Sequence, residues 1–140
     1  MSKIANIIGV KEASGDLEQV SRIIKGAGDE FLIYSGDDFL TLPILALGGH
    51  GVISVASHLA GNQIKEMIEA YDSGDAKRAA ALHYRLMDLF KILFITANPV
   101  PVKAALALTG TDVGGVRLPL VEATTAEKER ITAVLKDMEL

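Results

Sequence analysis

The chain has 140 residues and a formal net charge of −4, from 18 acidic and 14 basic side chains. This length fits one domain, and the 49% hydrophobic content excludes a disordered chain, because so much apolar surface collapses in water. The acidic balance and the absence of tryptophan disfavour nucleic acid as a partner, and the absence of cysteine excludes disulfides and thiolate chemistry.

Short apolar runs and helical patterns alternate in the first half of the chain. The runs predict buried strands over residues 6–10, 31–34 and 51–55. Apolar residues at helical spacing predict helices over about residues 17–24, 42–47 and 60–71. Strands that alternate with helices predict a parallel sheet with right-handed crossovers.

The second half of the chain has only helical patterns. The expected helices cover about residues 75–97, 98–108 and 125–138, the last after a capping box at Thr124–Glu127. The leucine-rich face of residues 82–94 predicts core packing or an oligomer contact. We therefore predict an α/β unit over residues 1–74 and a helical domain over residues 75–140.

One long stretch, residues 39–64, lacks Asp, Glu, Lys and Arg and is long enough to suggest a membrane span. Pro43 and the glycines of residues 48–51 divide it into shorter elements, so we expect no membrane partner. The N-terminus also lacks the apolar core of a signal peptide, and we expect a cytoplasmic protein.

Acidic turns follow the first two predicted strands. Asp16 is a candidate N-cap of the helix after it, and Asp37 or Asp38 of the next helix. These turns could instead present backbone N–H groups to an anion. Adjacent carboxylates rarely converge on a metal ion, and the histidines lack zinc spacing, so we expect no metal.

Lys11 directly follows the first apolar run, where a parallel strand delivers residues to the ligand-binding edge of a sheet. An amine among apolar neighbours loses solvation, and the free amine can attack a carbonyl to form a Schiff base. The alternative is a strand-end lysine that reaches water. Three strands alone would leave both sheet edges open, so we also expect a partner: the rest of a larger sheet, or a second copy.

Five segments in a fixed order carry a resemblance to a known family. They are Asn6–Asp16, Tyr34–Asp38, Gly48–Val55, Asn98–Lys103 and Arg117–Leu120. Together they resemble the C-terminal half of the dihydrodipicolinate synthase family, which belongs to the pyruvate-dependent Schiff-base aldolases. The resemblance covers nearly the whole chain.

The resemblance implies a (β/α)8 barrel, of which residues 1–74 would supply strands six to eight, with residues 75–140 as the C-terminal helical domain. Lys11 matches the lysine that forms the imine with pyruvate. Gly36 matches the glycine whose carbonyl lines the pyruvate pocket, and the main chain of Ile53 matches a pyruvate contact. The implied reaction condenses pyruvate with aspartate semialdehyde in lysine and diaminopimelate biosynthesis, without a cofactor, in a homo-oligomer.

The proton-relay tyrosine, the carboxylate-binding threonines and the substrate arginine of the family lie in its N-terminal half and have no match in this chain. Complete activity would therefore require that half. Two alternatives stay open: a half-barrel that self-associates and catalyses nothing, and a fragment of another 2-keto acid aldolase, such as N-acetylneuraminate lyase.

Overall fold

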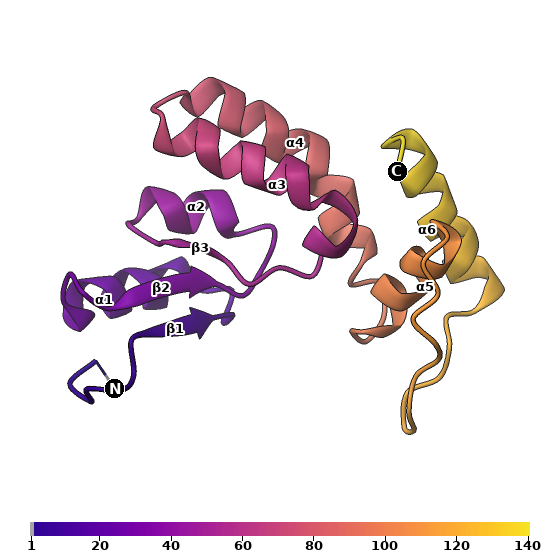
Figure 1. Cartoon of the computed structure of the whole chain (residues 1–140), viewed down its shortest axis with the longest axis horizontal. Coiled ribbons are helices and arrows are strands. Elements are labelled where there is room, and N and C mark those ends of the chain that lie inside the picture. Colours follow the sequence, from indigo (N-terminus) through magenta and orange to yellow (C-terminus); the bar gives the residue numbers. More distant parts are fainter. Residues whose placement is uncertain (1) are drawn as a thin grey trace.

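A parallel sheet of three short strands forms the first part of the chain (Figure 1). The computed structural model describes residues 2–140 and places β1 (Gly9–Glu12), β2 (Leu32–Ser35) and β3 (Gly51–Val52) side by side in chain order. Both pairings are parallel, and a helix connects each strand to the next. The predicted strand–helix alternation is therefore confirmed.

Six helices complete the described part of the chain. They are α1 (Leu17–Ala27), α2 (Thr41–Ala46), α3 (Ser57–Asp72), α4 (Ala76–Ile92), α5 (Val100–Leu108) and α6 (Thr125–Asp137). The uncharged stretch 39–64 is divided among α2, β3 and the start of α3, as predicted. Within residues 2–140, no helix combines the length and low polarity needed to cross a bilayer.

Side-chain caps begin α1 and α6 where the sequence predicts them. The Asp16 carboxylate accepts hydrogen bonds from the N–H groups of Glu18 and Gln19. Thr124 and Glu127 form a reciprocal capping box. Each cap satisfies N–H groups that a helix leaves free in its first turn, which stabilises the helix by about 1 kcal/mol.

β1 lies further along the chain than predicted. Residues 6–10 were expected to form the strand, but the pairing covers Gly9–Glu12, so Lys11 lies within the strand rather than after it. Ile8 is 70% exposed, although its carbonyl still accepts a hydrogen bond from Leu32 N–H. Hydrophobicity therefore located the strand only to within about three residues, because it does not specify which backbone groups pair.

Neither Asp37 nor Asp38 caps α2, and that prediction is wrong. The helix follows Leu40, and no side chain caps its first turn. The Asp37 carboxylate instead accepts a hydrogen bond from Phe39 N–H within the preceding turn, at 2.9 Å. The Asp38 carboxylate instead accepts hydrogen bonds from residues just before α3.

β3 is also shorter than predicted. The apolar run 51–55 predicts five residues, but the strand ends at Val52. The N–H groups of Val55 and Ala56 donate to the Asp38 carboxylate instead of to a neighbouring strand. Hydrogen bonds to the Asp38 side chain therefore replace strand pairing where the backbone leaves the sheet and enters α3.

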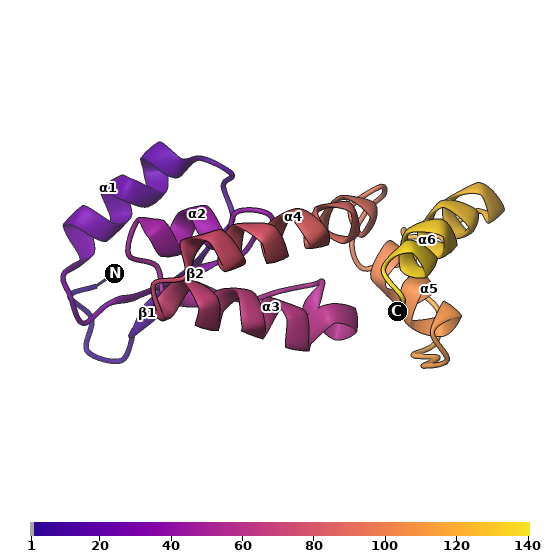
Figure 2. The same ribbon diagram turned by 90° about the horizontal axis from the view of Figure 1, so that it is seen from above.

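A core of buried helical residues joins the helices of the second half. α3 and α4 run side by side in both views, and α5 and α6 stand at the end of the molecule away from β1 (Figures 1 and 2). The α4 face predicted as core is confirmed by its buried residues Leu86, Leu89 and Phe90. The predicted boundary near residue 74 falls in the turn between α3 and α4, and the division into 1–74 and 75–140 stays a prediction.

Candidate active site

Lys11, Gly36 and Ile53 lie at the same edge of the sheet. Lys11 is the third residue of β1, whereas Gly36 directly follows β2 and Ile53 directly follows β3. Backbone hydrogen bonds link the strand ends: Gly36 N–H donates to the Glu12 carbonyl at 2.6 Å, and Ile53 N–H donates to the Ser35 carbonyl at 2.8 Å. This is the carboxyl edge, where parallel α/β folds bind their ligands.

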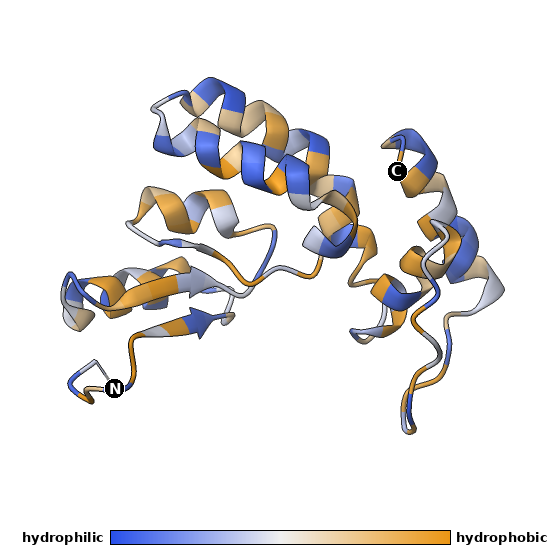
Figure 3. Ribbon diagram, in the orientation of Figure 1, coloured by the Kyte–Doolittle hydropathy of each residue, from blue (hydrophilic) through white to orange (hydrophobic). Residues whose placement is uncertain are grey.

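The two faces of the sheet differ in their exposure at this edge. Lys11 is exposed, whereas the next residue, Glu12, is only 6% exposed, because successive side chains of a strand point to opposite faces. Across the register, Lys11 pairs with the half-buried Tyr34, and Glu12 pairs with the fully buried Ser35. β1 correspondingly changes from hydrophobic to hydrophilic toward its carboxyl end (Figure 3). Lys11 therefore lies on the open face of the sheet.

The Lys11 side chain lies against the turn after β2. A Cβ atom placed on Gly36 would come within 2.8 Å of Lys11 Cε and 2.7 Å of Ala13 Cβ. Real Cβ atoms do not approach other atoms so closely, so only glycine leaves room for the lysine at this point. The amine-bearing end of Lys11 is therefore beside the Gly36 turn.

The sequence predicts that apolar neighbours shield Lys11 from water, and this prediction is wrong for the chain by itself. Lys11 is exposed, and β1 is an edge strand of the described sheet. Desolvation of an amine needs atoms on every side of it. In residues 2–140 such atoms lie on the Gly36 side but do not enclose the lysine.

Glu12 is a buried carboxylate directly beside Lys11 in the chain. Its Oε1 accepts hydrogen bonds from Ser14 N–H and Gln19 Nε2, both at 3.0 Å. Burial alone raises the pKa of Glu12, but the hydrogen bonds from Ser14 and Gln19 outweigh it and bring the pKa below its usual value. The carboxylate therefore stays ionised and ties the end of β1 to α1.

Asp38 is a second buried carboxylate at this edge and is 2% exposed. Its Oδ2 accepts hydrogen bonds from Val55 N–H at 3.0 Å and Ala56 N–H at 2.9 Å. Its Oδ1 is buried and has no hydrogen-bond partner among the described residues. The sequence did not predict the contact of Asp38 with Val55 and Ala56. These residues follow Asp38 by 17 and 18 positions, and a local sequence pattern does not link positions so far apart.

One of the three histidines is buried. His83, on α4, is 8% exposed, and burial lowers its pKa. Its ring lies against Phe39 in an edge-on arrangement, with ring centres 5.2 Å apart. Among residues 2–140 no cluster of His, Asp or Glu side chains could hold a metal ion.

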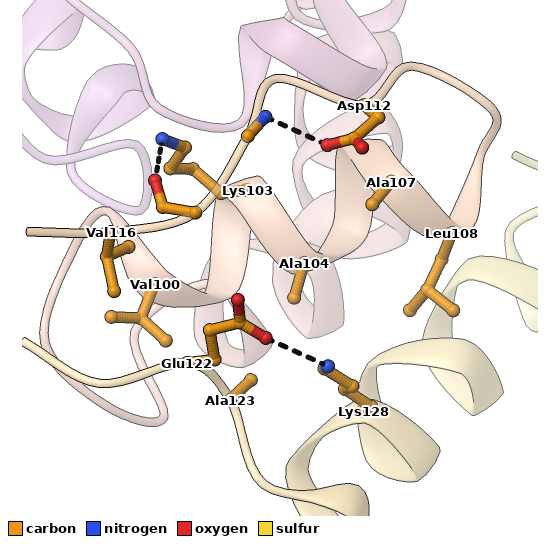
Figure 4. Close-up of a pocket in the computed structure, with 12 residues that line it drawn as sticks. Val100, Lys103, Ala104, Ala107, Leu108, Asp112, Val116, Glu122, Ala123 and Lys128 are labelled. Atoms are coloured by element: carbon orange, nitrogen blue, oxygen red, sulfur yellow. Dashed lines mark hydrogen bonds and ion pairs between the residues drawn. The ribbon is translucent and has the colours of Figure 1, made fainter.

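A cavity of about 370 Å³ lies between α5, α6 and the loop that joins them (Figure 4). Lys103 donates a hydrogen bond to the Gly115 carbonyl, and Lys128 pairs with Glu122 at 3.7 Å. The charged groups of both lysines are therefore partnered within the protein. This cavity is separate from the strand edge that carries Lys11.

Comparison with known proteins identifies one family over almost the entire chain. The model of the dihydrodipicolinate synthetase family matches residues 1–138. A 4-hydroxy-tetrahydrodipicolinate synthase from Moorella thermoacetica is 56% identical over 137 residues, which are 98% of this chain and 47% of the relative. The chain thus spans about half the length of the curated relatives it matches.

Solved structures agree with this assignment. A dihydrodipicolinate synthase from Cyanidioschyzon merolae is 49% identical with a TM-score of 0.93, over 96% of this chain and 46% of that one. The chloride-inhibited enzyme from Acinetobacter baumannii, complexed with pyruvate, is 33% identical with a TM-score of 0.92, over 99% and 47% of the two chains.

The fold prediction is therefore confirmed: three parallel strands with their helices form part of a (β/α)8 barrel, and a helical region follows them. The match at about half the length of the relatives corresponds to their C-terminal half. The chain belongs to the dihydrodipicolinate synthase family and spans the C-terminal half of its members.

Proposed function

We propose that this chain supplies the Schiff-base half of a 4-hydroxy-tetrahydrodipicolinate synthase, with Lys11 as the catalytic lysine and pyruvate as its first substrate. The observation that carries the proposal is the position of the Lys11 side chain against the Gly36 turn, at the carboxyl edge of a barrel sheet. Support comes from the family and from the pyruvate complex of a relative.

The chemistry needs an amine at this point. Lys11 Nζ attacks C2 of pyruvate, water leaves, and the resulting imine draws electrons from the neighbouring methyl carbon. Loss of a methyl proton gives an enamine, whose carbon attacks the aldehyde of aspartate semialdehyde. The product then cyclises and releases the lysine. Gly36 and the main chain of Ile53 border the pyruvate from the turns after β2 and β3.

The site needs groups that this chain does not carry. The family's proton-relay tyrosine, carboxylate-binding threonines and substrate arginine belong to the other half of the barrel. We propose that this half closes the open face of the sheet over Lys11 and removes water from it. The closed site would then hold pyruvate and the Lys11 amine together, away from bulk water.

Complementation tests this function directly. The chain is mixed with the N-terminal half of the Moorella thermoacetica relative, and condensation of pyruvate with aspartate semialdehyde is followed. We expect activity from the mixture and at most a trace from either half. If a folded mixture gave no condensation and no borohydride-trapped pyruvate, the proposed function would be wrong.

Gly36→Ala is expected to damage the site more than the fold. The new methyl group would lie 2.7 Å from Ala13 Cβ, 2.8 Å from Lys11 Cε and 3.1 Å from the Glu12 carbonyl oxygen, so both Lys11 and the chain at Ala13 must move. A displacement of about 1 Å costs up to about 10²-fold in rate. Borohydride trapping of pyruvate should therefore fall by about tenfold or more.

The matched control for this change is Gly26→Ala, because a Cβ on that helical glycine meets no atom within 4 Å. It should trap pyruvate as the unaltered chain does. Equal trapping by the Gly36 and Gly26 variants would show that Lys11 does not depend on the Gly36 turn.

The open sheet also predicts association with another chain. β1 and β3 are edge strands, and Ile8 and Ile53 are 70% and 50% exposed. Edge strands that expose apolar residues pair readily with other chains. We therefore expect the isolated chain to form a homo-oligomer by light scattering, and the added N-terminal half to replace the self-contacts. A stable monomer at micromolar concentration would contradict this prediction.

A further inference from the structure

Asp38 links the two turns that border the proposed pyruvate site. It lies two residues after Gly36, and its hydrogen-bond donor Val55 lies two residues after Ile53. Ser35 fixes the short segment between Gly36 and Asp38, because its hydroxyl donates to the Asp37 carbonyl at 2.6 Å and accepts from Asp37 N–H at 3.2 Å. The Asp38 carboxylate is thus rigidly mounted on the Gly36 turn.

The carboxylate also adds a second cap at the start of α3, where Ser54 Oγ already accepts a hydrogen bond from Ser57 N–H at 2.8 Å. α3 follows Ala56, which has no side chain able to cap it, and Ala56 N–H donates to Asp38 Oδ2. A negative charge at a helix N-terminus is favourable, since the helix dipole leaves partial positive charge there. The cap comes from a residue 18 positions earlier, so it fixes α3 relative to the β2–α2 turn.

Stability alone explains this arrangement poorly. Asp38 is 2% exposed, and its Oδ1 is buried without a hydrogen-bond partner in residues 2–140. A buried carboxylate oxygen without a partner costs free energy, and Ser54 already caps the start of α3 from a neighbouring position without that cost. The arrangement does connect the turn after β2 to the segment after β3 through two hydrogen bonds.

We infer that Asp38 is a positioning residue for the proposed reaction: it holds the main chain at Gly36 and Ile53 in the geometry that receives pyruvate beside Lys11. Asp38 itself touches no substrate. This inference rests on the proposed function, and it adds a residue whose contribution comes through two turns and not through direct contact.

The first test measures the turns without substrate. Amide hydrogen exchange is compared between the unaltered chain and Asp38→Ala, in the presence of the N-terminal half. Losing a hydrogen bond to a charged group should accelerate exchange at Val55 and Ala56 by about tenfold, with smaller increases near Gly36 and Ile53. Unchanged exchange at these amides would overturn the inference.

The matched control is Asp75→Ala, which removes a carboxylate cap from α4, a helix of similar length away from the site. It should accelerate exchange at the start of α4 and leave pyruvate trapping within about twofold of the unaltered chain.

The second test measures the pyruvate concentration that gives half-maximal trapping on Lys11. Asp38→Ala should raise it by about tenfold, whereas Asp38→Asn should raise it less, since the amide keeps one oxygen for the two N–H groups. An unchanged concentration in Asp38→Ala would overturn the positioning role while leaving the proposed function intact. No trapping on the unaltered chain would contradict both.

Discussion

Replacing Lys11 with arginine is expected to abolish both the trapping of pyruvate and the condensation reaction. Arginine keeps the positive charge and a long side chain, but its guanidinium stays protonated and cannot form an imine. Removing a covalent nucleophile costs on the order of 10³-fold or more in rate. The measurement is the condensation rate of the chain mixed with the N-terminal half of the Moorella thermoacetica relative, together with borohydride trapping.

Lys25→Arg is the control for this substitution, because Lys25 is an exposed lysine in the last turn of α1. Lys25→Arg should leave the condensation rate and the trapping of pyruvate within about twofold of those of the unaltered chain. Retention of more than about a tenth of the activity by Lys11→Arg would mean that another group forms the covalent intermediate.

Leu89→Ala should produce a large loss of stability. Leu89 is fully buried on α4, in the cluster that joins α3, α4, α5 and α6. Truncating such a leucine removes apolar contacts and leaves a cavity, which lowers the free energy of unfolding by about 2–5 kcal/mol. Since domains of this size are stable by only about 5–15 kcal/mol, urea denaturation should show a clearly lower midpoint.

Leu118→Ala provides the comparison, because Leu118 is 87% exposed in the loop between α5 and α6. Its effect should stay within about 0.5 kcal/mol in the isolated chain. Equal losses for the two leucines would contradict the assignment of the core.

The sequence predicted the order of the elements and the edge at which the candidate site lies. Continuous apolar runs and helical spacing depend on burial, which the fold preserves, so the three strands and the helices after them were found. Gly36 directly follows β2, close to the predicted end of that strand, whereas Ile53 follows β3 only because this strand ends earlier than predicted. Thr124 and Glu127 were also predictable, because a capping box depends only on residues three positions apart.

Two features at the site depended on contacts between distant residues and could not be predicted. The Asp38 carboxylate bonds to Val55 and Ala56, which explains both the uncapped α2 and the early end of β3. The exposure of Lys11 depends on what covers the open face of the sheet, and this chain spans only about half the length of its relatives. Local pattern carries no information on either point.

The most direct measurement is to locate pyruvate on the protein after reduction. The chain and its complementing half are incubated with isotopically labelled pyruvate, reduced with borohydride and digested, and the labelled peptide is sequenced by mass spectrometry. We predict one stoichiometric label, on Lys11. Label on a different lysine, or none on a folded complex, would contradict the assignment of this residue as the Schiff-base amine.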